Sequence, residues 1–88
     1  FIRATDLDPQ SYKIHYRLAS ALNIKNQYEG AKKSAKECLN IKRNYAPAYF
    51  ELGISEKALG NKVAAADAFE KAKKDKNWRK SAQFELDK

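Results

Sequence analysis

The stretch LGISEKALGNKVAAADAFEKAKKDKNW, residues 52–78, decides the fold of this chain. Its apolar and small residues recur at three- and four-residue steps, the spacing of one face of an α-helix. Gly60-Asn61 interrupts this pattern, and Gly is the usual residue just past a helix end. The stretch therefore predicts a helix over 46–59, a turn, and a second helix over 63–75.

The same pattern recurs along the chain at an interval of 34 residues. Apolar and small positions agree at this interval, whereas charged positions mostly differ. The matching sets are Leu18, Leu52 and Leu86; Ala31 and Ala65; Tyr16, Phe50 and Phe84; Ile14, Ala48 and Ala82; and Ala4, Cys38 and Ala72. This behaviour is typical of a repeated packing unit whose outer face is free to vary.

The interval predicts further helices on both sides of the opening stretch. The apolar spacing indicates helices over 12–26 and from Tyr28 to about Lys42, and it indicates the end of a helix before Asp8-Pro9. Pro47 is acceptable in a first helical turn. Asn77 is expected to cap a last helix that begins at about Trp78. The expected fold class is all-α, a solenoid of antiparallel helix pairs.

A helix, a short turn and a helix repeated at 34 residues resemble the tetratricopeptide repeat. The resemblance covers essentially the whole chain as one array: two complete units at 12–45 and 46–79, the end of a preceding unit at 1–11, and the start of a following unit or a capping helix at 80–88. The motif residues are Leu18, Ala19, Tyr28, Ala31, Cys38, Leu52, Gly53, Ala65, Phe69 and Ala72. The chain departs from the family pattern at Ala19, Ala35, Arg43 and Asn77.

The small residues have an expected role in packing. Gly53 and Ala65 allow the two helices of one unit to cross closely, and Phe69 fills the gap between units. Ala48, Ala72 and Ala82 let the next unit's first helix nest against its neighbour. Stacking of this kind buries a core that no single unit could bury alone.

Composition bounds the class of protein. The 88 residues suit one domain, and 43% hydrophobic with 33% charged residues suits a folded, helix-rich chain. No apolar run approaches the roughly 20 residues that span a membrane. The single cysteine excludes an internal disulfide and fits a reducing compartment such as the cytoplasm. Phe1 in place of Met suggests a piece of a longer protein.

No motif predicts an enzyme, a metal site or a cofactor. The sequence has no glycine-rich phosphate loop, HExxH, CxxC or GxSxG pattern. His15 has no second ligand beside it, and Cys38 stands at a small packing position, so both are interpreted as structural. The acids are expected on solvated helix faces, with i,i+4 pairs such as Asp67–Lys71; they are Glu51, Glu56, Asp67, Glu70 and Asp75.

The resemblance implies a concave groove, lined by the first helix of each unit, that holds a peptide or helix of a partner protein. Exposed aromatic residues in such a groove are candidate anchors, and cations around them suit a partner with apolar anchors and acidic flanks. The expected groove residues are Lys13, Tyr16, Arg17, Ser20, Asn23, Ile24, Phe50, Ile54, Lys57, Ala58, Phe84 and Lys88. The alternative is that Tyr16, Phe50 and Phe84 are core residues.

Two other functions stay open at this point. The net charge is +7, and residues 12–45 alone carry eight Lys/Arg against two Glu, mainly on the second helix, which suggests an anionic surface or nucleic acid as partner. The absence of interleaved aromatic residues argues against nucleic acid. End-to-end stacking of two copies is the other alternative, because solenoid ends expose packing surface.

Overall fold

The computed structural model describes residues 11–87, and within them it contains five helices and no strands. The helices are α2 (Ser11–Ile24), α3 (Tyr28–Ile41), α4 (Ala46–Ala58), α5 (Lys62–Ala72) and α6 (Arg79–Asp87). The all-α prediction is confirmed. The helix end expected before Asp8-Pro9 and the groove residue Lys88 lie outside the described residues.

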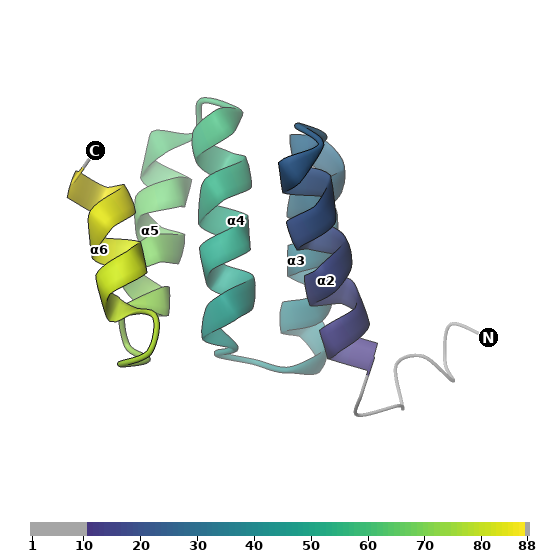
Figure 1. Ribbon diagram of the computed structural model, residues 1–88, viewed down its shortest axis with the longest axis horizontal. Coiled ribbons are helices and arrows are strands. Elements are labelled where there is room, and N and C mark those ends of the chain that lie inside the picture. Colours follow the sequence, from purple (N-terminus) through teal and green to yellow (C-terminus); the bar gives the residue numbers. More distant parts are fainter. Residues whose placement is uncertain (1–10, 88) are drawn as a thin grey trace.

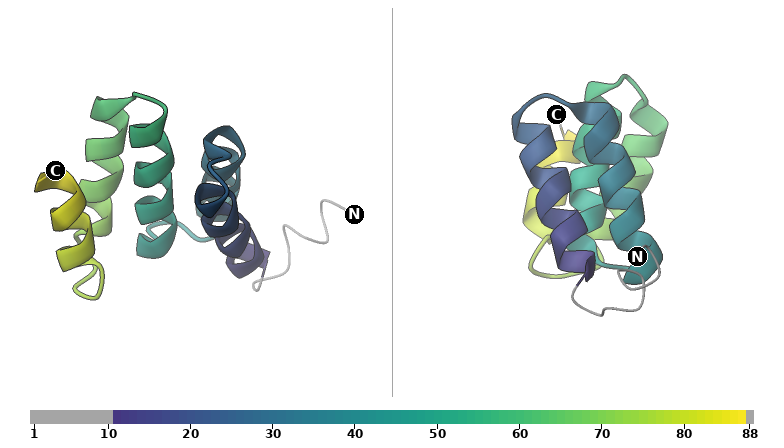
Figure 2. Two further views of the ribbon diagram at one scale, coloured as in Figure 1. Left: turned by 45° about the horizontal axis from the view of Figure 1, so that its top comes forward. Right: turned by 90° about the vertical axis from the view of Figure 1, so that its right-hand side faces the viewer.

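The helices form two layers (Figure 1). Short turns join α2 to α3 and α4 to α5 as helix pairs, and α3 packs on α4 while α5 packs on α6. As a result α2, α4 and α6 lie along one side of the molecule and α3 and α5 along the other, which the end-on view in Figure 2 also shows. This arrangement is the helical repeat that the 34-residue interval predicts.

The turns inside the two pairs are built alike. Asn26 and Gly60, 34 residues apart, both have positive φ, at 64° and 89°. In each turn the residue after the positive-φ position donates its backbone N–H to the carbonyl five residues earlier. Gln27 donates to Leu22 at 2.8 Å, and Asn61 donates to Glu56 at 2.8 Å. This left-handed closure satisfies carbonyls that the helix end leaves free. The predicted break at Gly60-Asn61 is confirmed.

The predicted ends of the last two helices need correction. α5 ends at Ala72 rather than Asp75, because the N–H groups of Lys74 and Asp75 bond three residues back, at 3.3 and 3.1 Å, and tighten the chain into a turn. The Asp75 carboxylate then accepts the N–H of Asn77 at 2.8 Å. Trp78, not Asn77, precedes α6, and its carbonyl accepts the N–H of Ala82 at 2.9 Å.

The core lies where α4, α5 and α6 meet. Phe69 is 1% exposed, and its ring contacts the Phe50 ring edge-on at 5.6 Å between centroids. Ala65, Phe69, Ala72 and Ala82 form one buried cluster, against which Leu86 of α6 also packs. Phe69 therefore fills the space between the second unit and α6, as the sequence predicts. Ala48, Ala72 and Ala82 are fully buried, which confirms their nesting role.

Gly53 is required by this core. A Cβ placed on Gly53 would lie 2.7 Å from Cε1 of the Phe69 ring and 2.8 Å from two further ring carbons. Gly30 is also helical, but its Cβ would lie 3.1 Å from a terminal methyl group of Leu22, which can move. The two glycines therefore differ in what a methyl group would displace.

We expect Gly53→Ala to destabilise the protein by about 1–3 kcal/mol, the usual cost of overpacking a core. Gly30→Ala is the matched control and should change stability by less, because the higher helix propensity of Ala, worth up to about 1 kcal/mol, offsets the tighter contact. Urea unfolding followed by circular dichroism measures both. Equal stability of the two variants would contradict the assigned role of Gly53.

Candidate functional site

The side formed by α2, α4 and α6 carries the residues expected in a groove. Lys13, Arg17 and Lys57 are exposed on it, and Tyr16, Ser20 and Ile54 are half-buried. Phe84 is 61% exposed on α6. Asn23, in contrast, is only 9% exposed and faces α4.

Asn23 links α2 to α4. Its Nδ2 donates to the backbone carbonyl of Glu51 at 3.1 Å and to the Glu51 carboxylate at 2.7 Å. Its Oδ1 is buried and accepts no hydrogen bond from the residues that the structure describes. Asn23 therefore holds two first helices together rather than facing solvent.

Lys57 makes the same link one interval further on. Its ammonium donates to the backbone carbonyl of Glu85 at 3.3 Å and forms an ion pair with the Glu85 carboxylate at 3.5 Å. In each link the donor contacts the residue 28 positions later in the chain. The two donors, Asn23 and Lys57, are 34 residues apart, and so are the two acceptors, Glu51 and Glu85. We call them the Asn23–Glu51 and Lys57–Glu85 clasps. The sequence contains a signal for the two clasps. Asn23 and Lys57 lie at equivalent positions of the 34-residue interval, and so do Glu51 and Glu85.

The interpretation of two acids as solvated was wrong. Glu51 is 8% exposed and Glu56 is 6% exposed. Glu56 accepts a hydrogen bond from Asn61 Nδ2 at 2.8 Å and pairs with Lys32 of α3 at 3.5 Å. Helical spacing alone could not predict the burial of these acids, because Asn23 and Lys32, which contact Glu51 and Glu56, lie on other helices. The predicted Asp67–Lys71 pair is confirmed at 3.2 Å.

The buried position of Glu51 alters its acidity. Burial raises the pKa of its carboxyl group, and hydrogen bonds from the side chains of Asn23 and Ser20 oppose that rise. Burial also raises the pKa of Tyr16, and the charge of Glu51 adds to the effect. Glu51 and Tyr16 therefore share one polar cluster on the groove side.

The three aromatic residues at the repeat interval occupy different surroundings. Tyr16 packs edge-on against Tyr45 of the α3–α4 turn, at 5.9 Å between ring centroids. Phe50 packs between Phe69 and Trp78, at 5.6 and 5.1 Å. Tyr16 and Phe50 are half-buried, whereas Phe84 presents most of its surface. Phe84 is thus the most accessible of the three.

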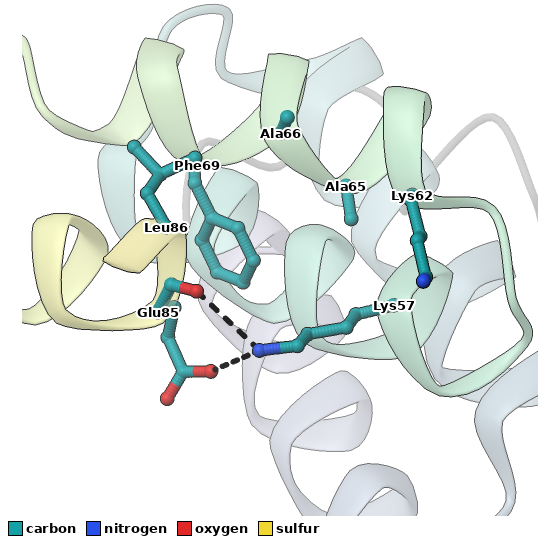
Figure 3. Close-up of a pocket in the computed structure, with 7 residues that line it drawn as sticks. All are labelled: Lys57, Lys62, Ala65, Ala66, Phe69, Glu85 and Leu86. Atoms are coloured by element: carbon teal, nitrogen blue, oxygen red, sulfur yellow. Dashed lines mark hydrogen bonds and ion pairs between the residues drawn. The ribbon is translucent and has the colours of Figure 1, made fainter. Parts of the chain in front are cut away.

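A cavity of about 230 Å³ opens beside the Lys57–Glu85 clasp. We call it the α5–α6 cavity; its lining comes from Lys57, Lys62, Ala65, Ala66, Phe69, Glu85 and Leu86. Figure 3 shows the Lys57 ammonium reaching both the carbonyl and the carboxylate of Glu85, with the Phe69 ring close by. Lys57 is the one residue that the cavity shares with the predicted groove.

Cys38 and His15, the two residues considered for reactivity or metal binding, are packed within the fold. Cys38 is fully buried, and burial raises the pKa of its thiol to about 11, so the reactive thiolate is disfavoured. His15 is half-buried on α2. Among residues 11–87, no group of three or more His, Cys, Asp and Glu side chains is placed to hold a metal ion.

A model of the tetratricopeptide repeat matches residues 12–45, the segment that contains α2 and α3. Residues 12–45 belong to the tetratricopeptide repeat family. Tetratricopeptide repeats generally mediate protein–protein interactions, and the helical repeat of this chain is consistent with a scaffold of that kind. No solved structure matches the chain.

Within residues 11–87, no helix is both long enough and apolar enough to cross a membrane.

The buried carboxyl of Glu51 gives a testable pH dependence. Because its pKa is raised in the folded state, folding favours the protonated form, and this stability is lost as pH rises through the folded-state pKa. We expect Glu51→Gln, which can still accept the Asn23 hydrogen bond, to gain in free energy of unfolding relative to wild type between pH 4 and pH 7. Urea unfolding at each pH measures it.

The matched control is Glu37→Gln, at an exposed position of α3. It should shift the free energy of unfolding by nearly the same amount at every pH. If Glu51→Gln follows the wild-type pH profile as closely as Glu37→Gln does, the carboxyl of Glu51 is not the group responsible.

Proposed function

We propose that this protein binds a peptide or helix of a partner protein along the side formed by α2, α4 and α6. The observation that carries the proposal is the set of cations and aromatic surface on that side, with Lys13 and Arg17 exposed on α2 and Phe84 exposed on α6. The proposed contact residues are Lys13, Tyr16, Arg17, Ser20, Asn23, Phe50, Ile54, Lys57 and Phe84. Within this set, buried Asn23 and packed Phe50 shape the surface more than they contact a partner.

We also propose the division of the chain that this binding mode needs. Residues 12–45 and 46–79 are two complete units of a single array over residues 1–88, with 1–11 ending a preceding unit. Residues 80–88 begin a following unit or form a capping helix. The two clasps support this division, because they join equivalent positions of successive first helices.

The clasps also support a preformed binding surface. Each fixes two neighbouring first helices by a side chain that contacts both a carbonyl and a carboxylate. A surface that is already ordered loses less conformational entropy when it binds a partner. The charge of the exposed side chains favours a partner with acidic residues beside its apolar anchors.

The test is selection of peptides from a random twelve-residue display library against the 88-residue protein. The best peptide is then measured against variants. We expect Lys13→Glu with Arg17→Glu to weaken binding about tenfold, because two attractive charge contacts become repulsive. Phe84→Ala should weaken binding by a similar factor, since exposed aromatic anchors often contribute about 1–2 kcal/mol. Isothermal titration calorimetry measures the affinities.

The matched control reverses two cations on the other side of the molecule. Lys33→Glu with Lys36→Glu changes the net charge equally, and both residues are exposed on α3. This variant should bind the peptide nearly as well as wild type. A greater loss in the control than in Lys13→Glu with Arg17→Glu would favour the alternative of an anionic partner on the α3 side, which a duplex DNA titration at low and high salt then examines.

A further inference from the structure

The turns that join one helix pair to the next concentrate the positive charge of this protein. Residues 42–45 connect α3 to α4 and residues 73–78 connect α5 to α6, and both turns lie at one edge of the molecule, the lower edge in Figure 1. These turns and the first two residues of α6 hold one acid, Asp75, and seven cations. We call the cations the basic edge: Lys42, Arg43, Lys73, Lys74, Lys76, Arg79 and Lys80.

The opposite edge shows no such concentration. The turns within the helix pairs, residues 25–27 and 59–61, hold a single cation, Lys25. Glu29 at the start of α3 and Glu56 near the end of α4 add acids there. Because the whole chain has a net charge of +7, the seven cations and one acid at the basic edge account for nearly all of it. The molecule is therefore electrically polarised along its helix axes.

The charges of the basic edge are little used inside the fold. Lys73 pairs with Glu70 at 3.8 Å, and the Asp75 carboxylate accepts the N–H of Asn77 at 2.8 Å. Five of the other cations are exposed and form no ion pair with the residues that the structure describes: Lys42, Arg43, Lys74, Lys76 and Lys80. Both turns lie between described helices, so their exposure does not depend on what flanks α2 or α6.

The aromatic residues of these two turns are engaged in packing. Trp78 packs on Phe50 at 5.1 Å between ring centroids, and Tyr45 packs edge-on against Tyr12 at 5.0 Å. Both Trp78 and Tyr45 are half-buried. Proteins that bind single-stranded nucleic acid stack bases on accessible aromatic rings, and these rings already have partners. The edge therefore offers charge without a stacking platform.

The layout of the edge favours a flat anionic partner. The α4–α5 pair separates the two charged turns, so a partner that uses both must offer negative charge at two places. A duplex is read by a helix or a β-ribbon in its groove, whereas this edge consists of turns. A bilayer with anionic lipids presents negative charge continuously, and each Lys or Arg near it strengthens binding about fivefold.

We propose that the basic edge binds the surface of a bilayer that contains anionic lipids. Arg43 of one turn and Lys74 and Lys76 of the other contact the lipid headgroups, and no side chain enters the hydrocarbon. The edge contains none of the residues assigned to the groove on α2, α4 and α6. Either proposal can therefore fail without the other.

The test is cosedimentation of the 88-residue protein with phosphatidylcholine vesicles that contain about one third phosphatidylserine. Two variants reverse the charge of one turn each: Lys42→Glu with Arg43→Glu, and Lys74→Glu with Lys76→Glu. We expect each to bind at least about tenfold more weakly than wild type, because two attractive charges become repulsive. Binding of the wild-type protein should also weaken as salt is raised, since salt screens exposed charges.

The matched control is Lys33→Glu with Lys36→Glu, which changes the net charge equally at exposed positions of α3. At 1.5 Å per residue these lysines lie about 14 and 9 Å from Lys42 along the helix axis. Both distances exceed the Debye length of about 8 Å at physiological salt, so the control should bind within about threefold of wild type. Circular dichroism checks that each variant is folded, and if one turn variant is unfolded the other decides.

Four outcomes overturn the proposal. No binding to the phosphatidylserine vesicles at low salt shows that the edge does not recognise a bilayer. Equal binding to vesicles of phosphatidylcholine alone shows that anionic headgroups are not the ligand. An equal loss in the control and in both turn variants makes net charge, rather than the edge, responsible. Tighter binding to a DNA duplex at the same salt, lost in both turn variants, makes nucleic acid the partner of this edge.

Discussion

The packing of the Phe69 ring against the bare backbone of Gly53 is the constraint on which the rest of the structure depends. The ring fits only because no Cβ stands at Gly53, where one would lie 2.7 Å from it. This contact sets how closely α5 approaches α4. Phe69 also belongs to the cluster that holds Ala82 of α6. A single aromatic residue thus joins the two helices of one unit to the first helix beyond them.

The first unit reaches the same architecture with a smaller core. Ala35 stands 34 residues before Phe69 and is fully buried, so no large ring fills the corresponding space. Polar contacts between helices are more prominent there: Asn23 bonds to Glu51, and Lys32 pairs with Glu56. Buried polar groups stabilise a fold only when their partners are in place, so these contacts fix the position of α4 closely. They also explain why Glu51 and Glu56 are buried, although their spacing is typical of a solvent-exposed helix face.

The periodic clasps connect packing to function. Successive first helices are fixed to one another through Asn23–Glu51 and Lys57–Glu85, on the side of the molecule where the proposed groove lies. Arg17 stands 34 residues before Glu51 and is exposed, so the acceptor position of the clasp becomes a cation on α2. The same backbone geometry therefore presents different chemistry along the array, which is how a repeat fold acquires a particular partner.

The sequence by itself determined the helical repeat, its turns and its small-residue contacts. Those features follow from local spacing: Gly60 must end a helix, and Gly53, Ala72 and Ala82 must be small wherever helices cross. Only the tertiary structure decided which polar residues are buried. Glu51 and Glu56 look like surface residues along one helix, because their partners Asn23 and Lys32 are distant in sequence. The α5–α6 cavity is likewise invisible in sequence, since its walls come from three helices and depend on the side chain that Ala66 lacks.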